Sequence, residues 1–200
     1  MLVGRADEKG EQVIIKENCI NNQEKILQVT EKLIIEKGIE STSLADIAKE
    51  VGISKGTLYY YYSSKNDLIN DIAHRYFKES TLKINKALQN IDTNSDPTKI
   101  IEITFKNILN AHENGKLHLC LIQEALMKNE DLRKQFNKEY IKWKNVVEEG
   151  LRKILKDKNI DYNVLSNIMV ATMDGFVLQS LLKTDSISPS SIAEYVVKNK

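Results

Sequence analysis

The segment from Ser43 to Lys65 constrains the fold more than any other part of the chain, because it encodes two short helices and the turn between them. An apolar stripe at helical spacing marks the first helix and consists of Leu44, Ile47, Ala48 and Val51. Ser43 and Asp46 fit a capping box at its start, and Gly52 fits the left-handed residue that often ends a helix. Ser54 can cap the second helix. This order of elements predicts a helix-turn-helix.

The second helix of this segment has an inward and an outward side. Leu58 and Tyr62 are four residues apart and share the side that faces the first helix. The outward side then carries a lysine, a glycine, a threonine and tyrosines between Lys55 and Tyr61. Because the start of the second helix enters the major groove in helix-turn-helix proteins, these groups suit phosphate oxygens and base edges. The segment therefore predicts a DNA-reading surface.

The stretch from Ile26 to Ile69 resembles the DNA-binding domain of the TetR family of bacterial transcriptional regulators. The resemblance rests on Ile26, Leu27, Gly38, Thr42, Ser43, Ile47, Ala48, the turn from Val51 to Ser54, the run from Gly56 to Tyr62, Lys65 and Leu68. The sequence departs from the usual family pattern at Val29, Thr30, Ile34, Ile39 and Tyr62, where the changes concern packing rather than DNA contact. By this resemblance, the phosphate and base contacts fall on Ser43, Lys55, Gly56, Thr57, Tyr59, Tyr60, Tyr61 and Lys65.

The net charge of the chain provides no bulk attraction to nucleic acid or to a membrane, because it is only +1 over 200 residues. Between Gln23 and Arg75, seven Lys or Arg oppose eight Asp or Glu. DNA binding therefore depends on where the positive groups lie, and we expect Lys55 and Lys65 to lie on the reading face.

The resemblance and the helical periodicity predict an all-α fold of about nine helices. A three-helix DNA-binding domain over residues 22–67 should precede a helical ligand-binding and dimerisation bundle over residues 68–200. We expect residues 1–21 to form a partly disordered arm, with extension of the first helix through Val13–Ile15 as the alternative. The first helix should start near Asn22, and later helices should be separated at residues 92–97, at Asn114-Gly115, at residues 128–129 and at residues 157–160.

Other chemistry is weakly represented. His112, His118 and Cys120 are the nearest approach to a metal site, but their spacing does not bring three ligands together. Cys19 and Cys120 are the only cysteines, which fits reduced thiols in a cytoplasmic protein. No catalytic pattern is present, so we expect no enzyme activity, no metal and no cofactor. No apolar run reaches the length of a membrane span, and we expect no membrane partner.

The resemblance also implies a ligand pocket in the bundle and a dimer interface on the last two helices. Candidate pocket residues are Phe105, Leu109, Leu121, Glu124, Met127, Tyr140, Trp143 and Met173. The same residue types line ordinary cores, so core packing is the alternative at each position. Such a lining favours a hydrophobic or amphipathic small-molecule effector. Candidate interface residues are Met169, Asp174, Gly175, Phe176, Leu178 and Tyr195, with a central core helix in a monomer as the alternative.

These observations predict a homodimeric, ligand-responsive repressor that binds a pseudo-palindromic operator, because twofold symmetry doubles the number of bases read. Two alternatives belong to other classes. One is a protein-interaction module that keeps the fold without specific DNA binding. The other is a helical enzyme or small-molecule-binding protein that keeps the helix-turn-helix as a scaffold, although no catalytic pattern supports an enzyme. An activator is a variant of the regulator hypothesis.

Overall fold

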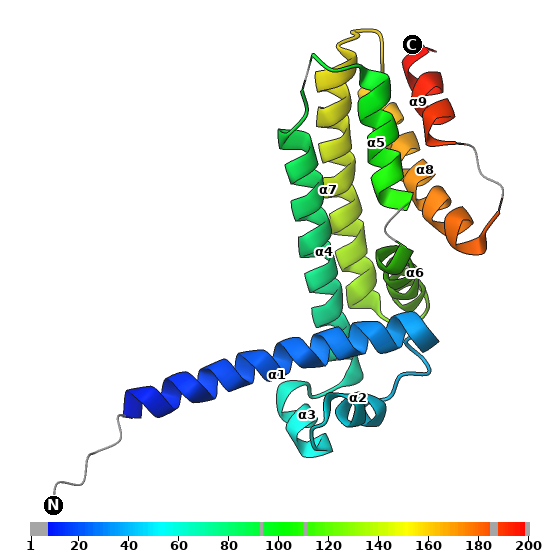
Figure 1. Ribbon diagram of the computed structural model, residues 1–200. Helices are drawn as coiled ribbons and strands as arrows, with labels where there is room; N and C mark the ends of the chain where they lie inside the picture. The colour runs from blue at the N-terminus through cyan, green and yellow to red at the C-terminus, as the bar shows by residue number, and fades with distance from the viewer. Residues whose placement is uncertain (1–7, 93, 110–111, 185–187, 199–200) are drawn as a thin grey trace, which may run out of the picture. The chain divides into compact units, whose positions relative to one another are not determined.

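The computed structural model describes residues 8–92, 94–109, 112–184 and 188–198, and the regular structure within them is helical. The helices of this part of the chain (Figure 1) are α1 (Glu8–Lys37), α2 (Leu44–Val51), α3 (Lys55–Tyr61), α4 (Lys65–Gln89), α5 (Pro97–Leu109), α6 (His112–Met127), α7 (Glu130–Leu155), α8 (Tyr162–Leu182) and α9 (Pro189–Lys198). For the described residues, the prediction of an all-α fold of about nine helices is confirmed.

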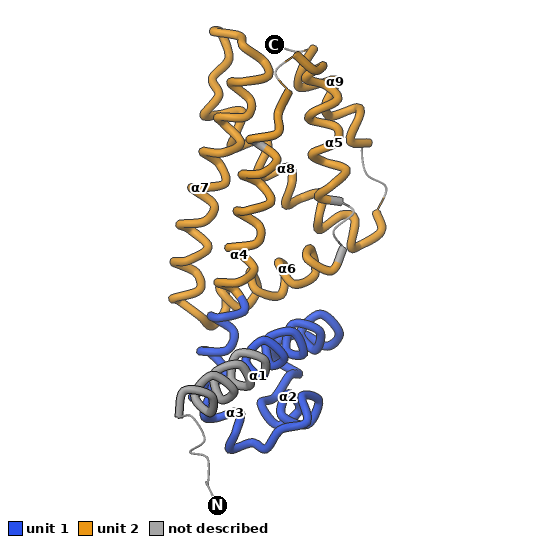
Figure 2. Tube along the Cα trace, turned by 60° about the vertical axis from the view of Figure 1, so that its left-hand side comes forward, with its two compact units in different colours: residues 1–72 blue, residues 73–200 orange. Residues whose placement is uncertain are grey.

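The chain divides between Ile72 and Ala73 into two compact units (Figure 2). The first unit contains α1, α2, α3 and the first turns of α4, and its core includes Ile26, Ile34 and Leu58. Leu68 and Ile72 of α4 are also fully buried. These contacts place the division a few residues beyond the predicted boundary at residue 67.

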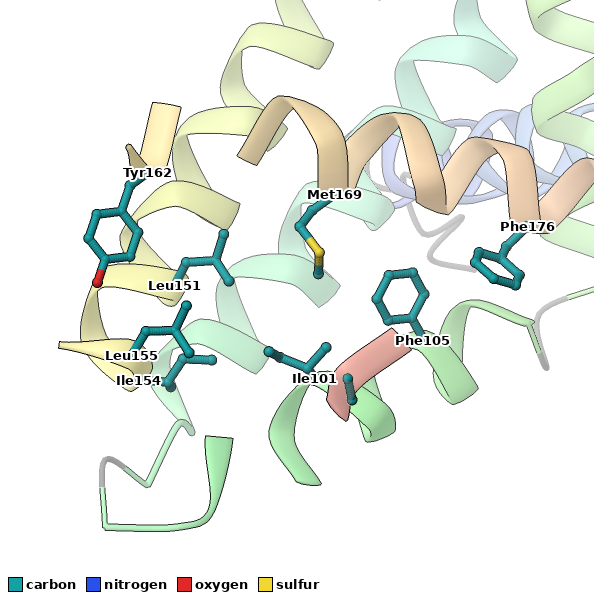
Figure 3. Packing of buried hydrophobic residues seen from close by; sticks show 9 residues of the cluster. Ile101, Phe105, Leu151, Ile154, Leu155, Tyr162, Met169 and Phe176 are labelled. Atoms are coloured by element: carbon teal, nitrogen blue, oxygen red, sulfur yellow. The ribbon is translucent and has the colours of Figure 1, made fainter. Parts of the chain in front are cut away.

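The second unit is a bundle in which α5 packs along α9, α7 packs along α8, and α6 contacts both α7 and α8. One apolar cluster joins α5, α7, α8 and α9 (Figure 3), where Ile101 and Phe105 meet Leu151, Met169 and Phe176. The rings of Phe105 and Phe176 meet edge to face, with their centroids 5.6 Å apart. This cluster is one part of the hydrophobic core of the bundle.

Two predicted helix boundaries are wrong. α1 begins at Glu8 rather than near Asn22, so the extension of the first helix that was the alternative is what the structure contains, while residues 1–7 lie outside the described residues. Gly115 does not separate two helices but lies inside α6. A Cβ atom at Gly115 would meet Cγ1 of Val177 at 2.9 Å, so this glycine permits a close approach of α6 to α8.

The prediction that no apolar stretch has the length of a membrane span is also wrong. α8, with 21 residues, is long and apolar enough to cross a membrane by length and composition alone. In the structure it packs against α5, α6 and α7 and contributes Met169 and Phe176 to the core of the bundle. A helix with the length and apolar composition of a membrane span therefore packs within a helical bundle here.

Candidate nucleic-acid interface

Hydrogen bonds at the ends of α2 and α3 fix the helix-turn-helix. The Ser43 hydroxyl accepts a bond from the Asp46 amide at 3.1 Å, and the Asp46 carboxylate accepts one from the Ser43 amide at 3.0 Å. This capping box, together with Lys37, lowers the pKa of Asp46 to about 2, the Ser43 amide being the largest cause. Gly52 ends α2 in the left-handed conformation (φ 81°) that glycine adopts without strain. Ser54 then caps α3 by accepting a bond from the Thr57 amide at 3.0 Å.

The outward side of α3 carries the predicted reading residues. Lys55 and Gly56 are exposed at the start of the helix, and Tyr60 is 80% exposed. Tyr59 is also exposed, whereas Tyr61 is half-buried with its ring edge-on to that of Tyr60. These groups form a row of one cation and two phenols on a rigid helix.

The other predicted contacts are already held by the protein. The Thr57 hydroxyl lies 2.8 Å from that of Ser54, so the threonine helps to fix the start of α3. The Lys65 ammonium donates to the backbone carbonyl oxygen of Ile39 and, at 3.5 Å, to that of Glu40. Lys65 therefore ties the start of α4 to the turn that follows α1.

A hollow of about 370 Å³ lies beside α3 in the first unit. It brings together Ser43 at the start of α2, Lys55 and Tyr59 of α3, and Lys65 of α4, and Glu40 also lines it. Because the start of a helix presents free amide groups and a positive dipole end, this hollow suits a phosphate group.

A polar group missed by the sequence reasoning joins three helices of this unit. The Tyr62 hydroxyl donates to Asp71 of α4 at 2.6 Å, and the Gln23 amide of α1 lies 3.4 Å from both partners. Burial, and then the Asp71 carboxylate, raise the pKa of Tyr62 above its usual value. The sequence signal was the tyrosine itself, which stands where the resembling family usually has phenylalanine. These bonds hold the end of α3 against α1 and α4.

The predicted pocket residues do not converge on one site. Phe105 lies in the core cluster with Met173 packed against it, Leu121 is buried, and Met127 is exposed at the end of α6. Glu124 is half-buried, and the side chain of Leu109 lies outside the described residues. Tyr140 and Trp143 of α7 do share a site, with two residues that the prediction missed, Tyr76 of α4 and His118 of α6.

This second group is a polar cluster inside the bundle. His118 is only 5% exposed, with Nδ1 3.0 Å from the Tyr76 hydroxyl and Nε2 3.2 Å from the Tyr140 hydroxyl. Tyr140 donates to the Asp174 carboxylate of α8 at 2.6 Å. Burial is the largest cause that raises the pKa of Tyr76, to about 12, and that of Tyr140, so both phenols remain donors. The available signal was that His118 falls on the apolar stripe of α6 with Leu117 and Leu121.

The predicted dimer residues divide into three groups. Met169 and Phe176 point into the core of their own chain (Figure 3) and are not available to a partner. Asp174 belongs to the polar cluster. Gly175, Leu178 and Tyr195 are at least partly exposed, and nothing in the described residues lies within 4 Å of a Cβ built at Gly175.

The first unit is thus a helix-turn-helix DNA-binding domain, with its caps formed and its reading side exposed. Residues 26–72 match the family model described as bacterial regulatory proteins of the tetR family. Over these residues the chain is similar to the DNA-binding domain of the TetR family of bacterial transcriptional regulators.

Individual relatives agree with this assignment. The HTH-type transcriptional regulator YvdT of Bacillus subtilis is 37% identical over 93 residues, a match that covers 43% of this chain and 48% of that protein, about half its length. YttP of the same organism, named a probable HTH-type transcriptional regulator, is 23% identical over 181 residues, or 88% of this chain and 82% of that protein. A protein from Saccharomonospora viridis, described as a transcriptional regulator in complex with choline, has the same fold. Its TM-score is 0.73 at 21% identity, with coverage of 88% of this chain and 93% of that one.

Proposed function

We propose that this protein is a cytoplasmic, ligand-responsive repressor that binds a pseudo-palindromic operator as a homodimer. The observation that carries the proposal is the exposed row of Lys55, Tyr59 and Tyr60 on α3, a helix that is capped by Ser54 and anchored by Leu58. A rigid helix with one cation and two phenols on its free side can enter a major groove and contact phosphates and bases.

The dimer is supported by a continuous stripe on α8. Val164, Ile168, Ala171, Leu178 and Leu182 are exposed, and with Gly175 between them they recur at helical spacing. An exposed apolar face of this length is typical of an interface. Tyr195 of α9 is also exposed. A second copy of the same helix would cover the stripe, and its close approach would explain a glycine in the middle of α8.

The stripe gives a direct test of the subunit contact. Ile168→Glu should convert the dimer to a monomer in sedimentation equilibrium, because two charges would be buried where the stripes meet. Ile141→Glu, at an exposed position of α7, is the matched control and should leave the dimer intact. A dimer that survives Ile168→Glu would place the interface elsewhere.

Ligand control is proposed through α4, which is one continuous helix from Lys65 to Gln89 and contributes to both units. A ligand that binds the bundle and shifts α4 would change the separation of the two reading helices and release the operator. By thermodynamic linkage, operator DNA must weaken ligand binding by the same factor. One structural relative is described as a complex with choline, which supports a small molecule as the effector.

DNA reading is tested by fluorescence anisotropy on a duplex taken from upstream of the coding region, against a scrambled duplex of equal length. We expect selective binding by the wild type and a loss of about 5- to 100-fold in Tyr60→Ala, the range for one lost base or phosphate contact. Ile141→Ala removes an exposed apolar side chain from α7, outside the reading surface, and should bind as the wild type does.

If the upstream duplex binds no better than the scramble, selection from random duplexes follows. Failure to select any sequence would favour the alternative function, a helical protein-interaction or small-molecule-binding module that keeps the fold. Regulation of either sign requires the same operator contacts, so transcription from a promoter that carries the operator separates repressor from activator.

A further inference from the structure

The imidazole of His118 occupies an aromatic cage inside the bundle. The ring centroids of Tyr76, Phe136, Trp143 and Tyr140 lie 5.6, 5.8, 6.2 and 6.3 Å from that of His118. The four rings come from α4 and α7, whereas His118 comes from α6. We use the term "aromatic cage" for Tyr76, Phe136, Tyr140 and Trp143.

A carboxylate closes one side of this cage. Asp174 Oδ1 lies 3.4 Å from His118 Nε2, and Asp174 Oδ2 accepts the hydrogen bond from Tyr140. Within the described part of the chain, no Lys or Arg side chain pairs with Asp174. The Asp174 side chain is 38% exposed, so the carboxylate is reachable from solvent while the imidazole is not.

Rings and a carboxylate arranged in this way attract positive charge. The face of an aromatic ring carries partial negative charge, and a cation within about 6 Å of a ring centroid is attracted to it. Quaternary and other organic ammonium groups are bound in proteins by such cages. In this chain the group at the centre of the rings is a side chain of the protein itself, the His118 imidazole.

Two hydrogen bonds link His118 and the cage residue Trp143 to α4. The Tyr76 hydroxyl bonds to Nδ1, and the Trp143 indole nitrogen donates to the Thr81 hydroxyl at 3.3 Å. Tyr76 and Thr81 are both residues of α4, the helix through which control of DNA binding is proposed. Removal of His118 from the cage would break one of these two bonds.

We propose that the aromatic cage and Asp174 form the effector site, and that a small organic ammonium ion binds there by displacing the His118 imidazole. This inference rests on the proposed function for its regulatory meaning and on the cage for its chemistry. The bound cation pairs with Asp174 and contacts the ring faces, while His118 releases Tyr76 and with it one tie between α6 and α4. The site is filled by the protein in the absence of effector and by the effector in its presence.

The test uses the single tryptophan of the chain, which is Trp143 of the cage. Tetramethylammonium is titrated into the protein at constant ionic strength, and tert-butanol is titrated in parallel as a neutral molecule of similar shape. We expect saturable change of Trp143 fluorescence with the cation only. Equal binding of tert-butanol would show an apolar site and overturn the assignment, as would the absence of saturable binding of either compound.

Two variants separate the cage from general effects of charge and folding. Asp174→Asn should weaken tetramethylammonium binding at least tenfold, whereas Glu149→Gln, which removes an exposed carboxylate of α7 paired with Lys153, should not change it. His118→Ala should bind the cation at least threefold more tightly, because the ligand no longer displaces a side chain. Equal affinities in Asp174→Asn and Glu149→Gln would refute the site even if His118→Ala does not fold.

Operator binding measured on the same samples distinguishes failure of the cation site from failure of the proposed function. Saturable binding at Trp143 with no change in operator affinity would leave the cation site standing and refute ligand control through it. Release of the operator by a neutral compound that does not perturb Trp143 would leave ligand control standing and refute this site.

Discussion

Replacement of Gly115 by alanine should force α6 and α8 apart and destabilise the bundle. The new Cβ would lie 2.9 Å from Cγ1 of Val177, whereas carbon atoms pack best at about 3.5–4.0 Å. Val177 is β-branched and has essentially one side-chain rotamer in a helix, so it cannot turn away. The helices must therefore separate by several tenths of an ångström.

The expected magnitude is the difference between two opposing effects. Overpacking of a core contact costs about 1–3 kcal/mol, and replacement of glycine by alanine in a helix gains about 1 kcal/mol. We therefore expect Gly115→Ala to lower the free energy of unfolding by about 1 kcal/mol. Urea unfolding at fixed protein concentration measures it, so that subunit association, where it occurs, contributes equally to every variant.

A second background isolates the contact. In Val177→Ala the obstructing methyl group is absent, so Gly115→Ala should then raise the free energy of unfolding by about 1 kcal/mol, the helix-propensity gain. The two effects differ by about 2 kcal/mol, which is the coupling energy of the pair. Equal effects of Gly115→Ala in both backgrounds, or stabilisation of the wild type by it, would refute the reasoning.

The same substitution should disturb the polar cluster. Gly115 of α6 contacts Val177 of α8. One turn further along the two helices, His118 of α6 lies beside Asp174 of α8. These are neighbouring contacts between the same two helices, so a wider separation at Gly115 lengthens the 3.4 Å distance between His118 and Asp174. Gly115→Ala should accordingly shift the emission of Trp143, which lies beside the His118 ring.

Three further predictions concern the DNA-binding unit. Lys55→Ala should reduce the salt slope of operator binding by about one unit, because its exposed ammonium can neutralise a phosphate. Lys65→Ala should leave this slope nearly unchanged and lower the free energy of unfolding by about 1 kcal/mol, because its ammonium binds carbonyl oxygens of its own chain. Anisotropy over a series of salt concentrations measures the slope, and urea unfolding measures the stability. An equal loss of slope in Lys55→Ala and Lys65→Ala would contradict these different roles of the two lysines. Tyr62→Phe should lower the free energy of unfolding by about 1 kcal/mol through loss of the bond to Asp71, and an unchanged urea midpoint would contradict it. The pKa of Asp46 is lowered to about 2 in the folded protein, so the stabilising effect of its carboxylate is complete above about pH 4 and is lost as the pH falls towards 2. The urea midpoint should therefore fall less over this pH range in Asp46→Asn than in the wild type.

The helix-turn-helix could be predicted from the sequence because its signals are local. The capping pair of Ser43 and Asp46, the left-handed Gly52 and the stripe on α2 each depend on residues within one or two helical turns, and the structure contains all three. The inward position of Leu58 follows from the same short-range spacing. Local signals of this kind fix the reading side of α3 without knowledge of the rest of the chain.

The interior of the bundle could not be predicted in the same way, because it is defined by contacts between distant helices. Gly115 was interpreted as a helix break because glycine near asparagine usually marks one, but contact with Val177, far along the chain, is what requires it. The role of Lys65 depends on the carbonyl group of Ile39, and the role of His118 depends on residues of α4, α7 and α8. Periodicity shows that a side chain is inward, but not which partner it meets.

The near balance of charge in the reading domain has a consequence for how this regulator is distributed in a cell. Attachment to arbitrary chromosomal DNA is driven by neutralisation of phosphates, and a chromosome offers about 10⁶ or more competing sites. The stretch from Gln23 to Arg75, with seven basic and eight acidic residues and with Lys65 bound to backbone carbonyl oxygens, has little charge to contribute to such attachment. For the proposed repressor, non-specific DNA should therefore compete weakly with the operator.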